Sequence, residues 1–362
     1  MEFIHQVVPY VTGNEARAVS EYILSGGWLT EFEKTRDFER AIAEFLGVRH
    51  AVVVPSGTVG LYLALLAAGV GPGDSVIVPN YTMIASPNSV RWTGAKVRLC
   101  DVESGTLCAD LEKASTDRRT KALMYVSING RCGDMDVVAR FCRANGIFLI
   151  EDACQAFGSR WRAKALGTFG DAGVLSFTPH KIITTGQGGA VVTDNEELYR
   201  EIVKLKDFGR TAPATDWHDR VGFNFKFTDL QSVIGIEQMK LMDFRIKRKK
   251  QIYARYEELL AGIPGIKMLP TDLGQTPPWF VDIILPSRRV RDGLAAHLKE
   301  RKIGTRPFYP PISHQEIYAG YPEGAFPVSE SIAHRGLWLP SSIGLKDEEI
   351  EYITDAVRAF LS

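Results

Sequence analysis

The sequence predicts an α/β protein: a mostly parallel, seven-stranded sheet in three layers, followed by a smaller C-terminal α+β domain. Short runs rich in Val, Ile and Leu alternate with helix-length segments from residue 50 to 195. The composition then changes beyond residues 240–250, where a Pro-rich patch and amphipathic helices follow. A chain of 362 residues suits about two domains. We therefore expect a large domain over residues 1–245 and a small domain over 246–362.

The seven expected strands are apolar runs that are short enough to cross a sheet once. They read AVVV at 51, SVIVP at 75, AKVRLC at 95, KALMYVSI at 121, GIFLIED at 146, AGVLSFT at 172 and GAVVTD at 189. Two helices are expected between them, TVGLYLALLAAG at 58 and MDVVARFCRANG at 135, each closed by a glycine. The first is apolar nearly all round, which predicts a buried helix.

The small domain is expected to begin within one long helical segment. Helical periodicity runs for about thirty residues from Leu230 to Leu260, longer than a usual globular helix. We expect it to span both domains. The helices VRDGLAAHLKERKIG and KDEEIEYITDAVRAFL follow.

Charge and composition argue against several function classes. Lys plus Arg and Asp plus Glu both total 43, which gives no electrostatic basis for binding nucleic acid or an anionic membrane. The basic run RIKRKKQ at 245 is interpreted as a solvated helix face. The start MEFIHQVVPYVTGNEAR lacks a signal-peptide pattern, and no window approaches about 20 apolar residues. The five cysteines show no metal-ligand spacing, so we expect reduced thiols, no metal and a cytoplasmic protein.

The stretch SFTPHKIITTGQGGAVVTD, from Ser176 to Asp194, places one lysine between two apolar strands. A lysine held away from water loses hydration, which disfavours the ammonium and makes the neutral amine available as a nucleophile. Lys181 is therefore a candidate catalytic residue. The alternative is a solvated lysine in a surface turn.

The turn PSGTVG, directly after the first strand, is a candidate phosphate site. Unpaired amides and the positive end of a helix dipole attract phosphate there, and the hydroxyls of Ser56 and Thr58 add donors beside Gly57. An ordinary capped helix start is the alternative. The motif is neither a dinucleotide fingerprint nor a P-loop, so nicotinamide and ATP lose their usual support.

Two further side chains follow neighbouring strands. Tyr81 comes after the second strand, where a ring could lie against a flat cofactor or could pack in the core. Asp152 ends an apolar strand, and its carboxylate needs a positive partner such as a protonated pyridine nitrogen; helix capping is the alternative. With Lys181 and the phosphate donor Ser176, these residues match the requirements of pyridoxal 5′-phosphate.

The sequence also resembles a known enzyme family over essentially its whole length. The matching stretches are SGTVGLYLALLAAGVGPGDSVIVPNYT, GDMD, IEDACQAFGS, SFTPHKIITTGQGGAVVTD and GFNFKFTDLQSVIGIEQM. They are similar to the DegT/DnrJ/EryC1/StrS sugar aminotransferases, which are fold type I pyridoxal phosphate enzymes.

That resemblance implies a role for each matching residue. Lys181 would bond covalently to the cofactor's aldehyde, Asp152 would pair with its pyridine nitrogen, and Gln155 would lie near its ring oxygen. Asn224 would reach the phosphate of the neighbouring subunit, which implies a homodimer with shared active sites. The group holding the phosphate would comprise Ser56, Gly57, Thr58 and Ser176.

Within the family, KIITTGQGG, DWHDRVGFNFKFTD, PPWFVDIIL and GTRPFYPPISHQEIY most resemble the members that aminate carbon 4 of GDP-4-keto-6-deoxymannose with L-glutamate. Those members contribute amino sugars to surface polysaccharides such as O-antigen. Two departures are present. Residues 127–129 read Ser-Ile-Asn where that group usually has His-Leu-Tyr, and Gln155 stands where Glu is frequent. We expect the first departure to bear on the sugar rather than on the reaction.

Arg306 is the candidate for binding the sugar nucleotide's diphosphate, with Tyr309 beside it; a structural arginine is the alternative. A UDP- or dTDP-linked keto-sugar is an alternative substrate. A sugar dehydratase of the same fold is an alternative reaction, but those relatives carry His in place of the lysine. A non-catalytic binding protein is the third alternative, and Lys181, Asp152 and Gln155 argue against it.

Overall fold

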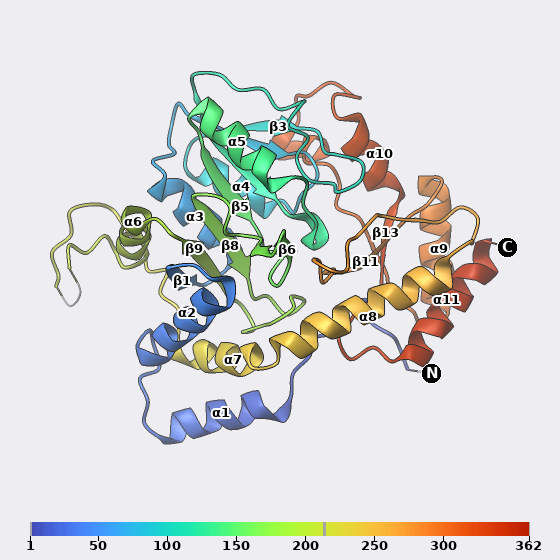
Figure 1. Ribbon diagram of the computed structural model, residues 1–362, viewed down its shortest axis with the longest axis horizontal. Helices are drawn as coiled ribbons and strands as arrows, with labels where there is room; N and C mark the ends of the chain where they lie inside the picture. The colour runs from blue at the N-terminus through green and yellow to red at the C-terminus, as the bar shows by residue number, and fades with distance from the viewer. Residues whose placement is uncertain (1, 213–214, 362) are drawn as a thin grey trace.

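The computed structural model describes residues 2–212 and 215–361, and a seven-stranded sheet forms the centre of the larger part of the described chain (Figure 1). The strand order is β1-β9-β8-β5-β4-β2-β3. Strand β9 runs antiparallel to β1 and β8, and the other strand pairs of this sheet are parallel. The strands are β1 (His50–Val54), β2 (Ser75–Pro79), β3 (Lys96–Cys100), β4 (Thr120–Val126), β5 (Phe148–Asp152), β8 (Ala172–Ser176) and β9 (Gly189–Thr193). All seven predicted strands are confirmed.

Helices cover both faces of this sheet because alternate strand residues point to opposite sides. In β1, Val52 and Val54 join one hydrophobic core, whereas Ala51 and Val53 join the other. The first core is closed by α3 (Gly57–Ala67), α4 (Ala85–Trp92) and α6 (Glu196–Lys206), and the second by α2 (Glu33–Leu46) and α5 (Met135–Asn145). The predicted three layers are confirmed.

The first helix after β1 is buried, as its composition predicts. The Ser56 side chain caps α3 by accepting a hydrogen bond from the Val59 amide. Apolar residues occur all round α3, and Leu61, Leu63 and Leu65 are at most 1% exposed. Because α3 begins directly after β1 ends, its N-terminus lies at the carboxyl edge of the sheet.

The single long helix expected from Leu230 to Leu260 is wrong. The structure has two helices, α7 (Asp229–Met239) and α8 (Met242–Leu260). Leu241 leaves the helical region with φ −106° and ψ 15°, which breaks the axis. Neither glycine nor proline marks the break, so local sequence contains no signal for it.

A four-stranded antiparallel sheet forms the core of the smaller part, in the order β10-β11-β13-β12. The strands are β10 (Lys267–Met268), β11 (Val281–Ile284), β12 (Arg306–Pro307) and β13 (Gly336–Leu339). Helices α8, α9 (Arg288–Glu300) and α11 (Asp347–Leu361) pack against it, which gives the smaller α+β unit. Ile4 also lies in this core and pairs with Ile303. The boundary at residue 245 remains a prediction, and α8 crosses that position.

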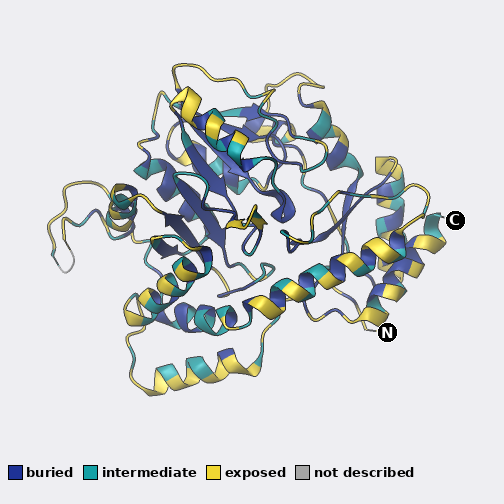
Figure 2. Ribbon diagram, viewed as in Figure 1, coloured by how far each residue is buried: buried dark blue, intermediate teal, exposed yellow. Residues whose placement is uncertain are grey.

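The remaining helices are peripheral. Helix α1 (Gly13–Leu24) lies at the lower edge of Figure 1 and is largely exposed in Figure 2. Helix α10 (Pro327–Arg335) precedes β13, and β6 (Arg160–Trp161) pairs with β7 (Lys164–Ala165). Among the described residues, no helix is both long and apolar enough to span a membrane.

Candidate active site

The carboxyl ends of several strands bring the predicted residues to one edge of the large sheet. Asp152 is the last residue of β5 and Ser176 the last of β8, while Ser56 follows the end of β1 by two residues. Because β1, β5 and β8 run in one direction, these ends meet at the same edge. Ligands of open α/β sheets bind at this edge.

The loop that follows β8 is fixed by hydrogen bonds on both sides of Lys181. The Lys181 amide donates to the Thr178 carbonyl at 2.9 Å. The Thr184 hydroxyl and the Thr185 amide donate to the Phe177 carbonyl at 3.0 and 3.1 Å. The threonines of the motif therefore close the loop on itself, which holds the lysine in one place.

The Lys181 amine lies over an aromatic ring, in a pocket that is lined by residues of both the larger and the smaller part of the chain. Its Nζ atom is 3.9 Å from the centre of the Trp279 ring. Burial lowers the pKa of Lys181 to about 8, although the charges of Cys154 and Asp152 oppose the shift. The neutral amine is therefore more accessible near physiological pH than it is for a solvated lysine. This agrees with the expected nucleophile and contradicts a fully solvated lysine.

Asp152 is buried with two hydrogen bonds to its carboxylate. It is 6% exposed, accepts from the Ser86 hydroxyl at 2.7 Å and accepts from the Cys154 amide at 3.2 Å. No arginine or lysine is within ion-pair distance of this carboxylate among the described residues. A buried carboxylate of this kind is suited to pair with a cationic group of a ligand.

The turn after β1 has the close packing of a phosphate cradle. A Cβ atom at Gly57 would lie 2.7 Å from the Cys154 sulfur and 3.2 Å from the Ser176 Cβ. At Gly189, a Cβ atom would lie 2.6 Å from the Gly57 amide nitrogen. The first amides of α3 have no intrahelical acceptor, so Gly57 and Thr58 can donate to an anion beside Ser176.

Gln155 lines the same pocket as Lys181 and Ser176. Its side chain is 8% exposed, and Oε1 accepts a hydrogen bond from the Asn129 amide at 2.8 Å. Arg306 and Tyr309 do not line this pocket but lie close enough for their charges to interact with groups at the site. The Arg306 guanidinium is 5.3 Å from the Tyr309 ring centre, and its positive charge contributes to the lowered pKa of Lys181.

Tyr81 and Asn224 do not line the Lys181 pocket. Tyr81 is 1% exposed and packs against Phe308 and Tyr309 at centroid distances of 5.8 and 6.3 Å. This is the core packing that was the alternative for that ring. Asn224 is exposed on the loop after α6, where it pairs with Asp207.

The interpretation of RIKRKKQ as a solvated face is wrong for two of its residues. Arg245 is 1% and Lys249 7% exposed, and both lie on one face of α8 because they are four residues apart. Arg245 donates to the carbonyls of Ile182 and Tyr10, both at 3.2 Å. Lys249 donates to the carbonyls of Trp279 and Ser341 at 2.5 and 2.8 Å.

Sequence reasoning missed Lys249 and Trp279 as parts of the pocket wall. Burial lowers the pKa of Lys249 to about 7. Both residues come from the smaller part of the chain, more than sixty residues after Lys181. All five cysteines are free in the structure, and the described residues contain no cluster of metal ligands.

The fold and this site define a pyridoxal phosphate-dependent enzyme with an α/β sheet. A glycine-lined anion site, a buried carboxylate and a lysine of lowered pKa fit a cofactor that has a phosphate, a ring nitrogen and an aldehyde. The model of the DegT/DnrJ/EryC1/StrS aminotransferase family matches residues 10–358. The chain belongs to this family and is an aminotransferase.

Relatives of known name match along the full length. The chain is 36% identical over 360 residues to GDP-perosamine synthase of Vibrio cholerae, covering 98% of each protein. It is 34% identical over 365 residues to GDP-perosamine synthase of Escherichia coli O157:H7, covering 100% of each.

Solved structures agree with the fold. The aminotransferase TlmJ from Streptoalloteichus hindustanus superposes with a TM-score of 0.93 at 32% identity, with 99% of this chain and 98% of TlmJ covered. The PLP form of the putative sugar aminotransferase Spr1654 from Streptococcus pneumoniae superposes with a TM-score of 0.92 at 25% identity, with 99% and 98% covered.

Proposed function

We propose that the protein transfers the amino group of L-glutamate to carbon 4 of GDP-4-keto-6-deoxymannose and so produces GDP-perosamine. The observation that carries the proposal is the Lys181 amine of lowered pKa in a pocket shared with Gln155 and Ser176, in a chain that is 36% identical to a GDP-perosamine synthase. The amino sugar would serve surface polysaccharides such as O-antigen, made in the cytoplasm.

The residues of the sheet edge would hold the cofactor. Ser56, Gly57 and Thr58 with Ser176 would bind its phosphate, and Asp152 would keep its ring nitrogen protonated. When bound, pyridoxal phosphate supplies an electron sink for the negative charge that develops at the donor's alpha carbon. Because Asp152 is only 6% exposed, little water would screen its charge interaction with the ring nitrogen.

Lys181 would act as both the covalent anchor and the proton carrier. When it is not bonded to the cofactor, its Nζ atom would take the proton from the alpha carbon of glutamate. A pKa near 8 suits this base, because both the neutral and the protonated amine are then accessible near neutral pH. The Trp279 ring, whose centre is 3.9 Å from Nζ, would stabilise the protonated form of this amine.

A homodimer would complete the site. Asn224 is exposed and outside the pocket of its own chain, which is consistent with a contact to the partner's phosphate site. Large apolar side chains are exposed on and after α1, among them Leu24 at 83%, Trp28 at 62% and Leu29 at 54%. Exposed apolar side chains gathered in this way would suit a contact surface between the two subunits.

A different nucleotide remains the second candidate. A transaminase of Streptomyces venezuelae that is named for a dTDP-linked sugar is 35% identical over 348 residues, close to the value for the Vibrio protein. Arg306 would neutralise the diphosphate of either nucleotide, so this contact does not discriminate between them. The same-fold dehydratase is the weaker alternative, since Lys181 is retained.

The test offers GDP-, UDP- and dTDP-linked 4-keto-6-deoxy sugars with glutamate to the purified protein and identifies the products by mass spectrometry. We expect replacement of the keto oxygen by an amino group on the GDP sugar, with 2-oxoglutarate formed in equal amount. A product on the dTDP sugar alone would establish the second candidate. Loss of a hydroxyl without gain of nitrogen would instead indicate a dehydratase.

A further inference from the structure

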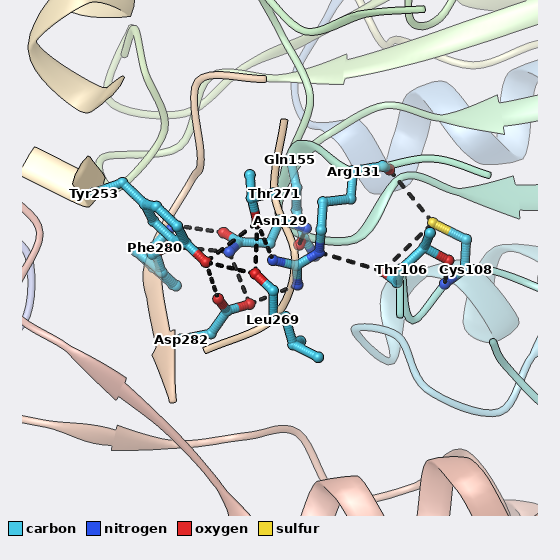
Figure 3. A network of polar contacts seen from close by, with 10 residues as sticks. All are labelled: Thr106, Cys108, Asn129, Arg131, Gln155, Tyr253, Leu269, Thr271, Phe280 and Asp282. Carbon is cyan, nitrogen blue, oxygen red and sulfur yellow. Dashed lines mark hydrogen bonds and ion pairs between the residues drawn. The ribbon is translucent and has the colours of Figure 1, made fainter. Parts of the chain in front are cut away.

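Asn129 lies in a short turn after β4, between the Gln155 side chain and strand β11 (Figure 3). It is 1% exposed, and its φ of 55° is in the left-handed region. Asparagine tolerates that region better than most residues do, because its short polar side chain can bond locally. The backbone therefore turns sharply here, and the turn aims both the Asn129 amide and its side chain.

The two ends of Asn129 bind two different parts of the pocket. Its backbone amide donates to Gln155 Oε1 at 2.8 Å. Its side chain pairs with both backbone groups of Phe280: Nδ2 donates to the carbonyl at 2.9 Å, and Oδ1 accepts from the amide at 2.6 Å. Phe280 directly follows Trp279, the residue whose ring lies over Lys181.

The second hydrogen of Asn129 Nδ2 donates to Asp282 Oδ2 at 2.9 Å. That carboxylate is itself fixed, because Arg131 pairs with it at 2.5 Å and the Tyr253 hydroxyl donates to it at 3.2 Å (Figure 3). Asp282 is 1% and Arg131 3% exposed. Moving Asn129 would leave several buried polar groups unpaired, which costs about 1–3 kcal/mol for each group.

These contacts decide which atom Gln155 presents to the pocket. Since Oε1 accepts from the Asn129 amide, the carbonyl end of the Gln155 side chain points toward the turn. The NH2 end is left for the pocket that Gln155 shares with Lys181. Gln155 is thereby oriented as a hydrogen-bond donor.

We propose that Asn129 is a positioning residue that fixes the Gln155 NH2 group as a donor to the cofactor's ring oxygen. The same residue ties this donor to the segment that carries Trp279. The inference rests on the proposed function, in which Gln155 faces the cofactor, and it concerns a residue to which neither the family match nor the relatives assign a role.

The primary variant is Asn129→Gly, because glycine keeps the left-handed turn and removes only the side chain. Asn129→Asp is the second variant, for the case in which the glycine form does not fold. It keeps the shape of the asparagine side chain but loses the two N–H donors of Nδ2. The control is Thr271→Val. Thr271 donates to the Tyr253 hydroxyl at 3.2 Å and accepts from Arg131 at 3.3 Å, so it belongs to the same network but lies outside the pocket.

The measurement is the pH midpoint of the visible absorbance of the full-length holoprotein. A donor to the ring oxygen favours the deprotonated bound cofactor, so loss of one hydrogen bond should raise the midpoint by about 0.5–1 pH unit. We expect this rise in Asn129→Gly or Asn129→Asp and not in Thr271→Val. In a Gln155→Ala background, the Asn129 substitution should add no further shift, because both act through one donor.

The inference would be overturned if both Asn129 variants had the same pH midpoint of absorbance as Thr271→Val. Additive shifts in a variant that combines Gln155→Ala with an Asn129 substitution would also overturn it. The visible absorbance of the wild type distinguishes a failure of the positioning role from a failure of the proposed function. A wild type that shows no visible band and no response to glutamate would contradict both, whereas a normal wild type with unshifted variants would contradict the positioning role alone.

Discussion

The Nζ atom of Lys181 lies 3.9 Å from the centre of the Trp279 ring, so this amine is covered by a residue from the smaller part of the chain. The ring is fixed by its own hydrogen bond, since Trp279 Nε1 donates to the His180 carbonyl at 2.8 Å. The Lys249 amine also donates to the Trp279 carbonyl. The ring that covers the lysine is thus held by the loop after β8 and by helix α8.

Replacing Trp279 by Leu should lower kcat/KM about tenfold, because a cation–π contact of this kind contributes ~1–2 kcal/mol to the protonated amine. Trp279→Phe keeps a ring face and loses only the Nε1 donor, so its kcat/KM should stay within about threefold of the wild type. Steady-state kinetics with glutamate checks this. Equal losses in both variants would show that the hydrogen bond, rather than the ring face, is what matters.

Asp152→Asn preserves the shape of the side chain and removes its charge. We expect kcat to fall by about 100-fold or more, as when other preorganised electrostatic contacts to a reacting group are removed. Ser86→Ala removes a hydrogen bond of 2.7 Å but leaves the carboxylate charged, so its kcat should fall by less than about tenfold. Steady-state kinetics of the two variants checks this, and a nearly normal kcat for Asp152→Asn would refute the pairing of this acid with the ring nitrogen.

Gly189→Ala tests the packing of the proposed phosphate site. The added Cβ would lie 2.6 Å from the Gly57 nitrogen and 2.7 Å from the Leu175 oxygen, which are backbone atoms that cannot move aside easily. The free energy of unfolding should fall by about 1–3 kcal/mol, and cofactor should be lost faster on dialysis. Gly13→Ala is the control, because its Cβ would meet nothing within 4 Å. Equal stability and equal cofactor retention in the two variants would contradict this account.

Lys249 should make stability depend on pH in a defined direction. Burial lowers the pKa of this lysine to about 7, so the folded protein binds fewer protons than the unfolded chain above that pH. Below about pH 7 the buried ammonium of Lys249 lowers the free energy of unfolding by its full amount. This destabilisation decreases as the pH rises from about 7 toward the ordinary pKa of lysine. The melting temperature of the wild type should therefore rise relative to Lys249→Met between pH 6 and 9, to be followed by thermal denaturation in parallel buffers. A constant difference between the two proteins would contradict the lowered pKa.

The larger sheet could be predicted from the sequence because its strands are buried on both faces and are continuous apolar runs, such as Val76 to Val78 in β2. The positions of the residues at the strand ends could also be predicted, because a recognisable strand fixes where its last side chain lies. Asp152 and Ser176 are each the final residue of a strand. Their approach to Lys181 follows from the sheet topology.

The rest depends on contacts across long separations, which leave no local pattern. Arg245 and Lys249 are basic residues in a basic run, and only packing against Tyr10, Ile182 and the Trp279 carbonyl distinguishes them from solvated neighbours. The break at Leu241 has no glycine or proline. Tyr81 occupies the right position after β2, but small-domain rings cover it.

The central claim is that the Lys181 amine carries the proton in both half-reactions. The most direct measurement follows transfer of nitrogen from glutamate to the GDP-linked keto-sugar by mass spectrometry, with wild type and Lys181→Ala in parallel and with cofactor saturating. We expect the wild type to form the amino sugar and Lys181→Ala, folded as judged by circular dichroism, to form none above background. Turnover by Lys181→Ala at a rate near that of the wild type would contradict the account.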